Sequence, residues 1–161
     1  MYITTSRKPS NSTKIIASNI SNFLNSTYEP RGKKSIEEIV ERANDLGFRR
    51  IMVISEQKGN PNKIAFLDSR GEWKWIFPFI IFSAPTEYTI KKIKPVKKEV
   101  ELSFDKGCEN IADLFDIQAP QTDDISTVYI SKNKIDFKYK QEKLTLNIKE
   151  LLESKVVDES E

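Results

Sequence analysis

The fold is decided by the stretch Phe48-Arg49-Arg50-Ile51-Met52-Val53-Ile54-Ser55. Its four central residues, Ile51 to Ile54, are apolar without any alternation. A strand with one solvated face alternates apolar and polar residues, whereas an unbroken apolar run is typical of a parallel-sheet strand that is covered on both faces. We therefore predict a buried strand at 48–55 in an α/β sheet with helices on each side.

Two helical patterns precede this strand. The first spans residues 11–25 and has apolar residues at i, i+4, i+7 and i+8, counted from Ile16. The second begins at Ser35, which forms a capping box with Glu38 three residues later, and it ends before Gly47. The polar face of the first helix is rich in Asn and Ser, which are weak helix formers, so packing must stabilise it.

Short strands at 2–5 and 27–29 complete a β-α-β-α-β pattern. The first helix follows a strand and the second precedes one, so both run in the same direction and the chain must cross the sheet between them. The nine residues 26–34 can span this distance at about 3.3 Å per residue, as an edge strand before Pro30. Right-handed crossovers then make all three strands parallel.

This pattern brings three positively charged loops to one edge of the sheet, at the C-terminal ends of its parallel strands. They are Ser6-Arg7-Lys8-Pro9-Ser10, Arg31-Gly32-Lys33-Lys34-Ser35 and Ser55-Glu56-Gln57-Lys58-Gly59-Asn60-Pro61. Open α/β sheets bind ligands at that edge, and helix starts there offer N–H groups and a positive dipole end to phosphate. Lys33 and Lys34 lie where the dipole disfavours cations, which an anionic ligand explains. The alternative is that both lysines are simply solvated.

Composition excludes several classes of protein. The chain of 161 residues fits one domain of ordinary size, and it has no histidine and a single cysteine, Cys108. Zinc sites of Cys and His are therefore excluded, and no glycine-rich nucleotide motif is present. We interpret Cys108 as structural and expect no metal and no cofactor. No apolar run is long enough for a membrane helix and the start does not resemble a signal peptide, so we expect a soluble, cytoplasmic protein.

The net charge of +2 conceals an asymmetry. Residues 1–98 hold 18 Lys and Arg against 9 Asp and Glu, whereas residues 99–161 hold 8 against 15. A basic half of this size attracts polyanions. The alternative is a solvated surface of uneven composition.

The rest of the first half suggests a hairpin. A turn is expected at Asn60-Pro61, a strand at 63–68 and a second turn at 69–71. Trp73, Trp75 and Phe77 then share one strand face. They either stack on unpaired bases or belong to the core, and core is the commoner use of such residues. Residues 86–98 are predicted to form an exposed strand that leads into a lysine-rich linker, which extends the phosphate track or is solvated.

The second half is predicted to be mostly β-structure. Strands are expected at 100–104, 127–130, 135–139 and 144–148, with a loop at 116–125. Short helices are expected at 109–115 and at 150–154.

Three ordered motifs resemble the Brix domain family of ribosome-biogenesis proteins, most closely its short stand-alone archaeal members. They are Ile3-Thr4-Thr5-Ser6-Arg7-Lys8-Pro9-Ser10, Arg31-Gly32-Lys33-Lys34-Ser35 and Ile54-Ser55-Glu56-Gln57-Lys58-Gly59-Asn60-Pro61. The match covers about the first 70 residues, and the second half matches only in outline.

The resemblance implies a single α/β domain over residues 1–161 made of two similar halves. Each half would be a mixed sheet with helices packed on it, like the anticodon-binding domain of class IIa aminoacyl-tRNA synthetases. The basic half would span about 1–84, a basic linker 85–98 and the acidic half 99–155, with a frayed acidic end at 156–161. The resemblance also implies RNA binding in ribosomal RNA processing and subunit assembly, without catalysis.

We predict that precursor ribosomal RNA is the main partner and that ribosomal or assembly proteins are others. The expected phosphate contacts are Arg7, Lys8, Arg31, Lys33, Lys34, Lys58 and Lys63. Gly32 and Gly59 would let the RNA backbone approach closely, beside Asn60.

Two alternatives remain. One is a protein-interaction module whose acidic second half docks on a basic ribosomal or assembly protein. The other is a small enzyme that uses carboxylates such as Asp123 and Asp124. Adjacent acidic residues in a loop are commonly solvated, and no base, nucleophile or metal constellation accompanies them in the sequence.

Overall fold

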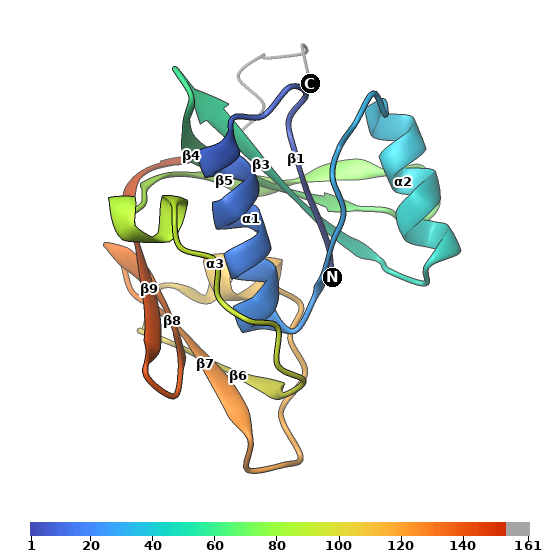
Figure 1. Ribbon diagram of the computed structural model, residues 1–161. Helices are drawn as coiled ribbons and strands as arrows, with labels where there is room; N and C mark the ends of the chain where they lie inside the picture. Colours follow the sequence, from blue (N-terminus) through green and yellow to red (C-terminus); the bar gives the residue numbers. More distant parts are fainter. Residues whose placement is uncertain (154–161) are drawn as a thin grey trace.

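The computed structural model describes residues 1–153, and their strands form one continuous nine-stranded sheet in the order β2-β1-β3-β4-β5-β9-β8-β7-β6 (Figure 1). The elements of the first half are β1 (Tyr2–Thr5), α1 (Asn11–Leu24), β2 (Thr27–Tyr28), α2 (Ile36–Asp45), β3 (Arg50–Gln57), β4 (Asn60–Asp68), β5 (Lys74–Ser83) and the 3-10 helix η1 (Thr86–Thr89). Those of the second half are β6 (Glu99–Phe104), α3 (Glu109–Leu114), β7 (Ile125–Ile130), β8 (Lys134–Tyr139) and β9 (Glu142–Leu152).

The predicted β-α-β-α-β unit is confirmed. Strand β1 lies between β2 and β3 and is parallel to both, with β2 at the edge of the sheet. In β3, Met52 and Ile54 belong to the core beneath α1, whereas Ile51 and Val53 belong to the core beneath α2. Both sets are fully buried. The unbroken apolar run of β3 therefore reflects a strand that is covered on both faces, as its sequence predicts.

Both helices begin where their capping residues predict. The Ser10 side chain accepts a hydrogen bond from the N–H of Thr13 at the start of α1. Ser35 and Glu38 form the predicted capping box at the start of α2. Figure 1 shows α1 crossing the middle of the molecule and α2 standing apart from it at the side.

The second half is joined to the first by the antiparallel pairing of β5 with β9. Within it, β6 is parallel to β7, and β7, β8 and β9 follow in antiparallel order. Helix α1 packs against this half too, because Ile16, Ile20 and Phe23 share one core with Val128 and Phe137. The two regions therefore fold around a common core.

Three predictions about local structure are wrong. Residues 150–152 continue β9, because Leu151 and Leu152 pair with Ile80 and Phe79 of β5, and this pairing overrides a local preference for helix. Residue 154 of the predicted helix and the predicted frayed end at 156–161 lie outside the described residues.

The β3–β4 turn is Lys58-Gly59, both with positive φ, and Asn60-Pro61 already belongs to β4. Residues 86–89 form η1 where an exposed strand was expected, because Tyr88 is buried.

The lysine-rich linker is bound to α1. Buried Asn19 donates hydrogen bonds to the carbonyls of Tyr88 (3.1 Å) and Lys91 (2.7 Å) and accepts one from the N–H of Ile93 (2.9 Å). Asn22 donates a further bond to the carbonyl of Ile93 at 2.9 Å. These contacts explain the weak helix formers on the polar face of α1, since they position the linker.

Candidate functional site

The three basic loops lie together at one edge of the sheet, as predicted. In Figure 1 the β1–α1 connection, the β2–α2 connection and the β3–β4 turn all lie along the upper edge of the molecule. The N–H of Ser6, at the end of β1, donates a 3.0 Å hydrogen bond to the carbonyl of Ile54 in β3. The parallel pairing of β1 with β3 thus brings the first and third loops side by side.

Glu56 joins the first loop to the third. Its carboxylate accepts hydrogen bonds from the N–H of Ser10 at 2.8 Å and from the hydroxyl of Thr13 at 2.5 Å. The Ser10 hydroxyl in turn donates to the carbonyl of Gly59 at 2.7 Å. Burial raises the pKa of the Glu56 carboxyl, but the bonds from Thr13 and Ser10 outweigh this effect and leave the pKa below its ordinary value.

Arg31 joins the second loop to the first. Its side chain is 1% exposed and donates hydrogen bonds to the carbonyls of Thr5 (2.9 Å) and Lys34 (2.7 Å). The guanidinium is therefore directed at the protein backbone, and its contribution to the site is to hold the second loop against the end of β1. The sequence analysis lists Arg31 among the phosphate contacts, because the sequence of a basic motif does not show which of its arginines and lysines are buried.

The helix starts contribute less to anion binding than the sequence suggests. At the start of α1 the N–H of Ser10 is bonded to Glu56, and the Thr13 N–H is bonded to the Ser10 hydroxyl. At the start of α2 the N–H groups of Ser35 and Glu38 bond to each other's side chains. Four backbone donors are thus already used, so basic side chains dominate the positive charge of this edge.

The remaining predicted residues lie on or beside the surface of this edge. Four basic side chains are exposed: Arg7, Lys8, Lys33 and Lys58. Two more are half-buried: Lys34 and Lys63. The Lys63 ammonium lies 5.7 Å from the centre of the Phe79 ring, on the face of the sheet. Exposed basic charge therefore comes from all three loops.

Gly32 and Gly59 have φ values of 58° and 79°, which favour glycine, and no atom lies within 4 Å of a Cβ built on either. The backbone at both positions is therefore open to a ligand. Asn60 is exposed directly after Gly59.

A groove adjoins the β3–β4 turn and has a cavity volume of about 650 Å³. Its walls come from the first turn of α1, the β3–β4 hairpin, the end of β5 and η1. The lining residues are Ser12, Gln57, Lys58, Asn60, Pro61, Asn62, Phe82, Ser83, Ala84, Thr86, Thr89 and Ile90. Sequence reasoning missed this groove, because residues from three separate segments form it.

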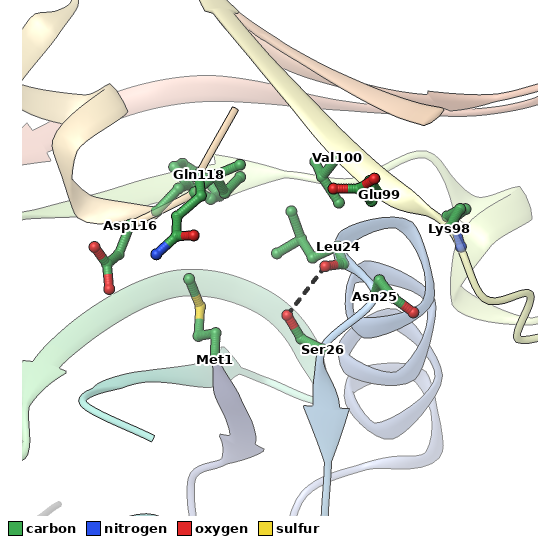
Figure 2. A pocket seen from close by; sticks show the side chains of 11 residues that line it. Met1, Leu24, Asn25, Ser26, Lys98, Glu99, Val100, Asp116 and Gln118 are labelled. Carbon is green, nitrogen blue, oxygen red and sulfur yellow. Dashed lines mark hydrogen bonds between the residues drawn. The ribbon is translucent and has the colours of Figure 1, made fainter. Parts of the chain in front are cut away.

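A second, smaller cavity of about 200 Å³ lies at the other end of α1 (Figure 2). Figure 2 shows Met1, Leu24 and Asp116 around it, and Ser26 donates a 3.3 Å hydrogen bond to the carbonyl of Leu24 beside it. This cavity separates the N-terminus from the second half, and it lies away from the basic loops.

Trp73, Trp75 and Phe77 are half-buried. Trp73 and Trp75 pack against the core beneath α2, with their ring centres 6.3 Å apart. Trp75 and Phe77 both contact Phe79, at 5.5 and 4.4 Å between ring centres. The packing of both tryptophans favours the core interpretation.

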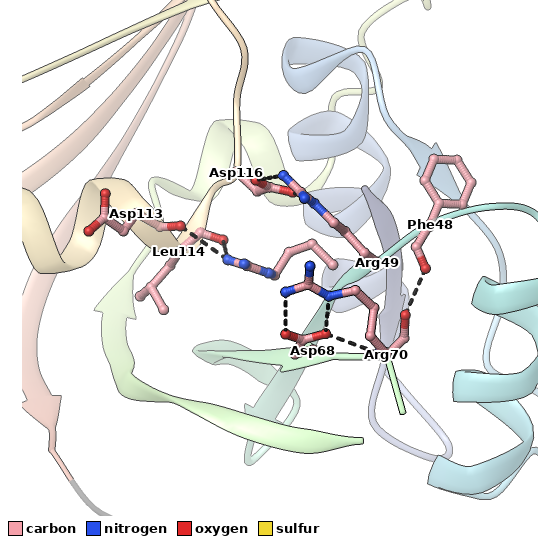
Figure 3. Close-up of polar contacts among 9 residues, drawn as sticks. Phe48, Arg49, Asp68, Arg70, Asp113, Leu114 and Asp116 are labelled. Carbon is pink, nitrogen blue, oxygen red and sulfur yellow. Dashed lines mark hydrogen bonds and ion pairs between the residues drawn. The ribbon is translucent and has the colours of Figure 1, made fainter. Parts of the chain in front are cut away.

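Arginines near the opposite end of β3 fasten the two halves together (Figure 3). Arg49 forms a bidentate ion pair with Asp116, with its Nε atom 2.7 Å from Oδ2 and its Nη2 atom 2.6 Å from Oδ1. Arg50 donates to the carbonyls of Leu114 (2.7 Å) and Asp113 (3.1 Å) at the end of α3. These arginines are occupied by internal contacts and do not belong to the basic edge.

Two lysines of the linker are also engaged in internal contacts. Lys98 is buried, donates to the carbonyls of Asn22 and Val96, and lies 4.8 Å from the centre of the Tyr139 ring. Burial lowers the pKa of Lys98. Lys91 pairs with Glu142 at 3.1 Å. The linker is therefore less available to a ligand than its composition suggests.

Within residues 1–153, no group of three or more His, Cys, Asp or Glu is arranged to hold a metal ion. No helix in this part of the chain is long and apolar enough to cross a membrane.

Asp124 accepts a hydrogen bond from the Tyr139 hydroxyl at 2.9 Å. Cys108 is buried, and burial raises the pKa of its thiol, which agrees with a structural role.

The sequence is similar to a set of archaeal proteins that share one description. It is 32% identical over 123 residues to a probable Brix domain-containing ribosomal biogenesis protein of Methanothermobacter thermautotrophicus, covering 76% of this chain and 74% of the relative. The chain belongs to the Brix domain family of ribosomal biogenesis proteins. The predicted membership of this family is thereby confirmed, although no family model matches the sequence.

Other Brix domain relatives match over a shorter part of their length. Probable Brix domain-containing ribosomal biogenesis proteins of Pyrococcus furiosus and Thermococcus kodakarensis are 31% and 33% identical over 106 and 104 residues. These matches cover 63% and 62% of this chain, and 48% and 50% of the relatives. This Brix domain chain thus spans about half the length of these relatives.

Two solved structures share the Brix domain fold described above. One is Mil, an archaeal Imp4-like protein, with a TM-score of 0.69 and 24% identity over 96% of this chain and 100% of that one. The other is a probable ribosomal biogenesis protein from Aeropyrum pernix K1, with a TM-score of 0.72 and 22% identity over 95% and 98% of the two chains.

Proposed function

We propose that this Brix domain protein is a non-catalytic RNA-binding factor that assists ribosomal RNA processing and subunit assembly. The observation that carries the proposal is the convergence of exposed basic side chains from three separate loops at one edge of the sheet. Arg7 and Lys8 come from the first loop, Lys33 from the second and Lys58 from the third. The ligand with the matching chemistry is a chain of phosphates.

The residues have two roles in this proposal. Exposed Arg7, Lys8, Lys33 and Lys58, with half-buried Lys34 and Lys63, contact phosphates of precursor ribosomal RNA. Gly32 and Gly59 present an open backbone at the same edge, with Asn60 beside them. Buried Arg31 positions the second loop instead of contacting phosphate directly, and Glu56 holds the first and third loops together.

We further propose that the domain consists of two related halves, each similar to a class IIa synthetase anticodon-binding domain, and that it acts in the cytoplasm. In support, a parallel strand pair followed by two antiparallel strands occurs twice. In the first half these strands are β1, β3, β4 and β5, and in the second half they are β6, β7, β8 and β9. We also propose that the chain is a single domain, which is supported within residues 1–153 by the core that both halves share.

The function is tested by measuring affinity for a ribosomal RNA fragment in competition with duplex DNA of equal length. We expect the protein to bind the RNA and to retain it against an equal concentration of the DNA. DNA that displaces the RNA at parity would point to unspecific attraction of polyanions and would contradict the assignment.

A second candidate function is docking on a basic ribosomal or assembly protein. It is favoured by β6, which ends the sheet and leaves one side without a neighbouring strand among the described residues. This strand carries exposed Glu101 and Phe104, which is 43% exposed. A basic extended segment could pair with such an edge. A partner that stays bound after nuclease treatment would favour this function.

A further inference from the structure

The groove beside the β3–β4 turn combines an apolar floor with a polar rim. Phe82 and Pro61 are buried beneath it, and Ala84 is half-buried at its side. The rim carries the amide side chains of Gln57, Asn60 and Asn62, and the hydroxyls of Ser12, Thr86 and Thr89. An apolar surface with a few polar groups around it is typical of sites for small flat ligands, and about 650 Å³ lies in the usual range for such sites.

The polar groups of the rim suit a nucleobase. An amide side chain presents a donor and an acceptor next to each other, which is the pattern on the edge of an unpaired base. Gln57 and Asn62 lie close enough for a weak contact of 3.4 Å between their amides. In this contact the Asn62 amide donates to the Gln57 carbonyl oxygen, so the amide N–H groups of Gln57 and the carbonyl oxygen of Asn62 are the donor and the acceptor that face a ligand.

One wall of the groove is an unusually exposed apolar side chain. Ile90 is 71% exposed, more than the other large apolar side chains that are exposed in the described part of the chain. It follows η1, whose position is fixed because Tyr88 is buried and Asn19 binds the carbonyls of Tyr88 and Lys91. Because Ile90 lines the groove, a ligand in the groove removes part of this apolar side chain from water.

The charge at the mouth of the groove selects the ligand. Lys58 both lines the groove and belongs to the basic edge. A ligand that carries a phosphate beside a flat polar ring satisfies Lys58, the amides and Ile90 at the same time. Among the described residues that line the groove, Lys58 is charged and none is an Asp or Glu, so the lining itself favours an anionic ligand.

We propose that this groove takes one unpaired base of the bound RNA, while Lys58 contacts the adjoining phosphate. The inference rests on the proposed function and adds to it a preference for single-stranded segments. Phosphate contacts alone position RNA without selecting unpaired nucleotides. A pocket that accepts a base selects them, because a base in a duplex is not available to enter it.

The test uses two ligands of equal length and phosphate number, a single-stranded RNA and an RNA chain whose riboses lack bases. Affinities are measured by fluorescence anisotropy over a salt series, for the wild-type protein and for Thr86→Trp, which fills the groove from an exposed position. We expect the wild-type protein to prefer the chain with bases by about tenfold, which is typical for one well-held base. We expect Thr86→Trp to abolish that preference.

Ile90→Ala serves as a second variant, with Leu46→Ala as its matched control. Both remove an exposed apolar side chain, but Leu46 lies at the C-terminal end of α2 and does not line the groove. Ile90→Ala should weaken binding of the single-stranded RNA with an unchanged salt slope, because no charge is lost, whereas Leu46→Ala should have no effect.

The possible outcomes separate the two claims. If the wild-type protein binds RNA with a steep salt dependence but ignores the missing bases, the groove is not a base site and the proposed function stands. The same holds if Thr86→Trp leaves the preference intact. If the wild-type protein shows no salt-dependent binding of either chain, the proposed function is contradicted and the base site with it.

Discussion

The guanidinium of Arg31 donates a 2.9 Å hydrogen bond to the carbonyl of Thr5, which joins the loop before α2 to the end of β1. A second bond from the same side chain, 2.7 Å long, fixes the carbonyl of Lys34. One residue of the basic motif thus holds the edge in shape, while its neighbours Lys33 and Lys34 carry charge toward the surface. The motif thus combines a structural cation with two lysines that we propose as phosphate contacts.

This division predicts that Arg31→Met reduces stability. The variant leaves two backbone carbonyls without their charged donor, so we expect a loss of about 2–3 kcal/mol in the free energy of unfolding, measured by urea denaturation. Lys33→Met is the matched control, because Lys33 is exposed in the same loop, and it should stay within about 0.5 kcal/mol of the wild-type protein. Equal stability of the two variants would contradict the structural role of Arg31.

Glu29 predicts a defined pH dependence of stability. The hydrogen bonds that Arg42 and the Tyr2 hydroxyl donate to its carboxylate lower the pKa of this group from 4.5 to about 2, although burial alone would raise it. Because the pKa of Glu29 is lower in the folded state than in the unfolded state, the ionised carboxylate stabilises the fold at any pH above the unfolded-state pKa. This contribution is lost as the pH falls from about 4.5 toward 2.

The measurement compares urea midpoints of the wild-type protein and Glu29→Gln between pH 7 and pH 3. The variant lacks this titration, so the difference between the two proteins should shrink as the pH falls below 4.5. A difference that stays constant over this range would show that the ion pair with Arg42 does not stabilise the folded state.

The hydrogen bonds of Asn19 predict that the lysine-rich linker is protected from proteases. The side chain is fully buried and makes three hydrogen bonds to the linker, so Asn19→Leu should lower the free energy of unfolding by about 2 kcal/mol. Trypsin should then cleave faster after Lys91, Lys92 and Lys97, whereas Lys94 is followed by Pro95 and is not a cleavage site. Asn11→Ala, at an exposed position of the same helix, is the control and should leave the cleavage pattern unchanged.

The hydrogen bonds from Arg50 to α3 predict that this residue of β3 stabilises the helix. Its bonds to the carbonyls of Leu114 and Asp113 place a cation at the C-terminal end of that helix, where the dipole favours one. Arg50→Leu should cost about 1–2 kcal/mol. Arg49→Gln removes the bidentate ion pair with Asp116, in which the arginine is half exposed, and should cost less, at most about 1 kcal/mol. If Arg49→Gln were the more damaging change, this assignment would be wrong.

The sequence predicted those features that depend on local pattern. The apolar run in β3 correctly indicated a strand with both faces covered, and Ser35 with Glu38 correctly indicated the start of α2. The order of helices and strands was enough to place the three loops at one edge. These signals are local or follow from chain direction, so a single sequence contains them.

The features that sequence reasoning missed depend on partners far away along the chain. Burial of Arg31 follows from its contact with Thr5, and the role of Glu56 follows from contacts with Ser10 and Thr13. Residues 150–152 look helical in isolation and become a strand only beside β5. Such contacts have no local signature, because the partner lies 25 or more residues away.

Binding of RNA phosphates by the three loops is tested by the slope of log affinity against log salt concentration. The slope is measured with a ribosomal RNA fragment for the wild-type protein and for Arg7→Glu/Lys33→Glu/Lys58→Glu, with the reversal of Lys106, Lys132 and Lys138 as a control of equal charge change. The three loop residues are exposed, so the melting temperature should hardly change. We expect the loop variant to lose about 2–3 units of slope and most of its affinity, while the control changes little. Equal slopes for the loop variant and the wild-type protein would show that the three loops do not bind the phosphates.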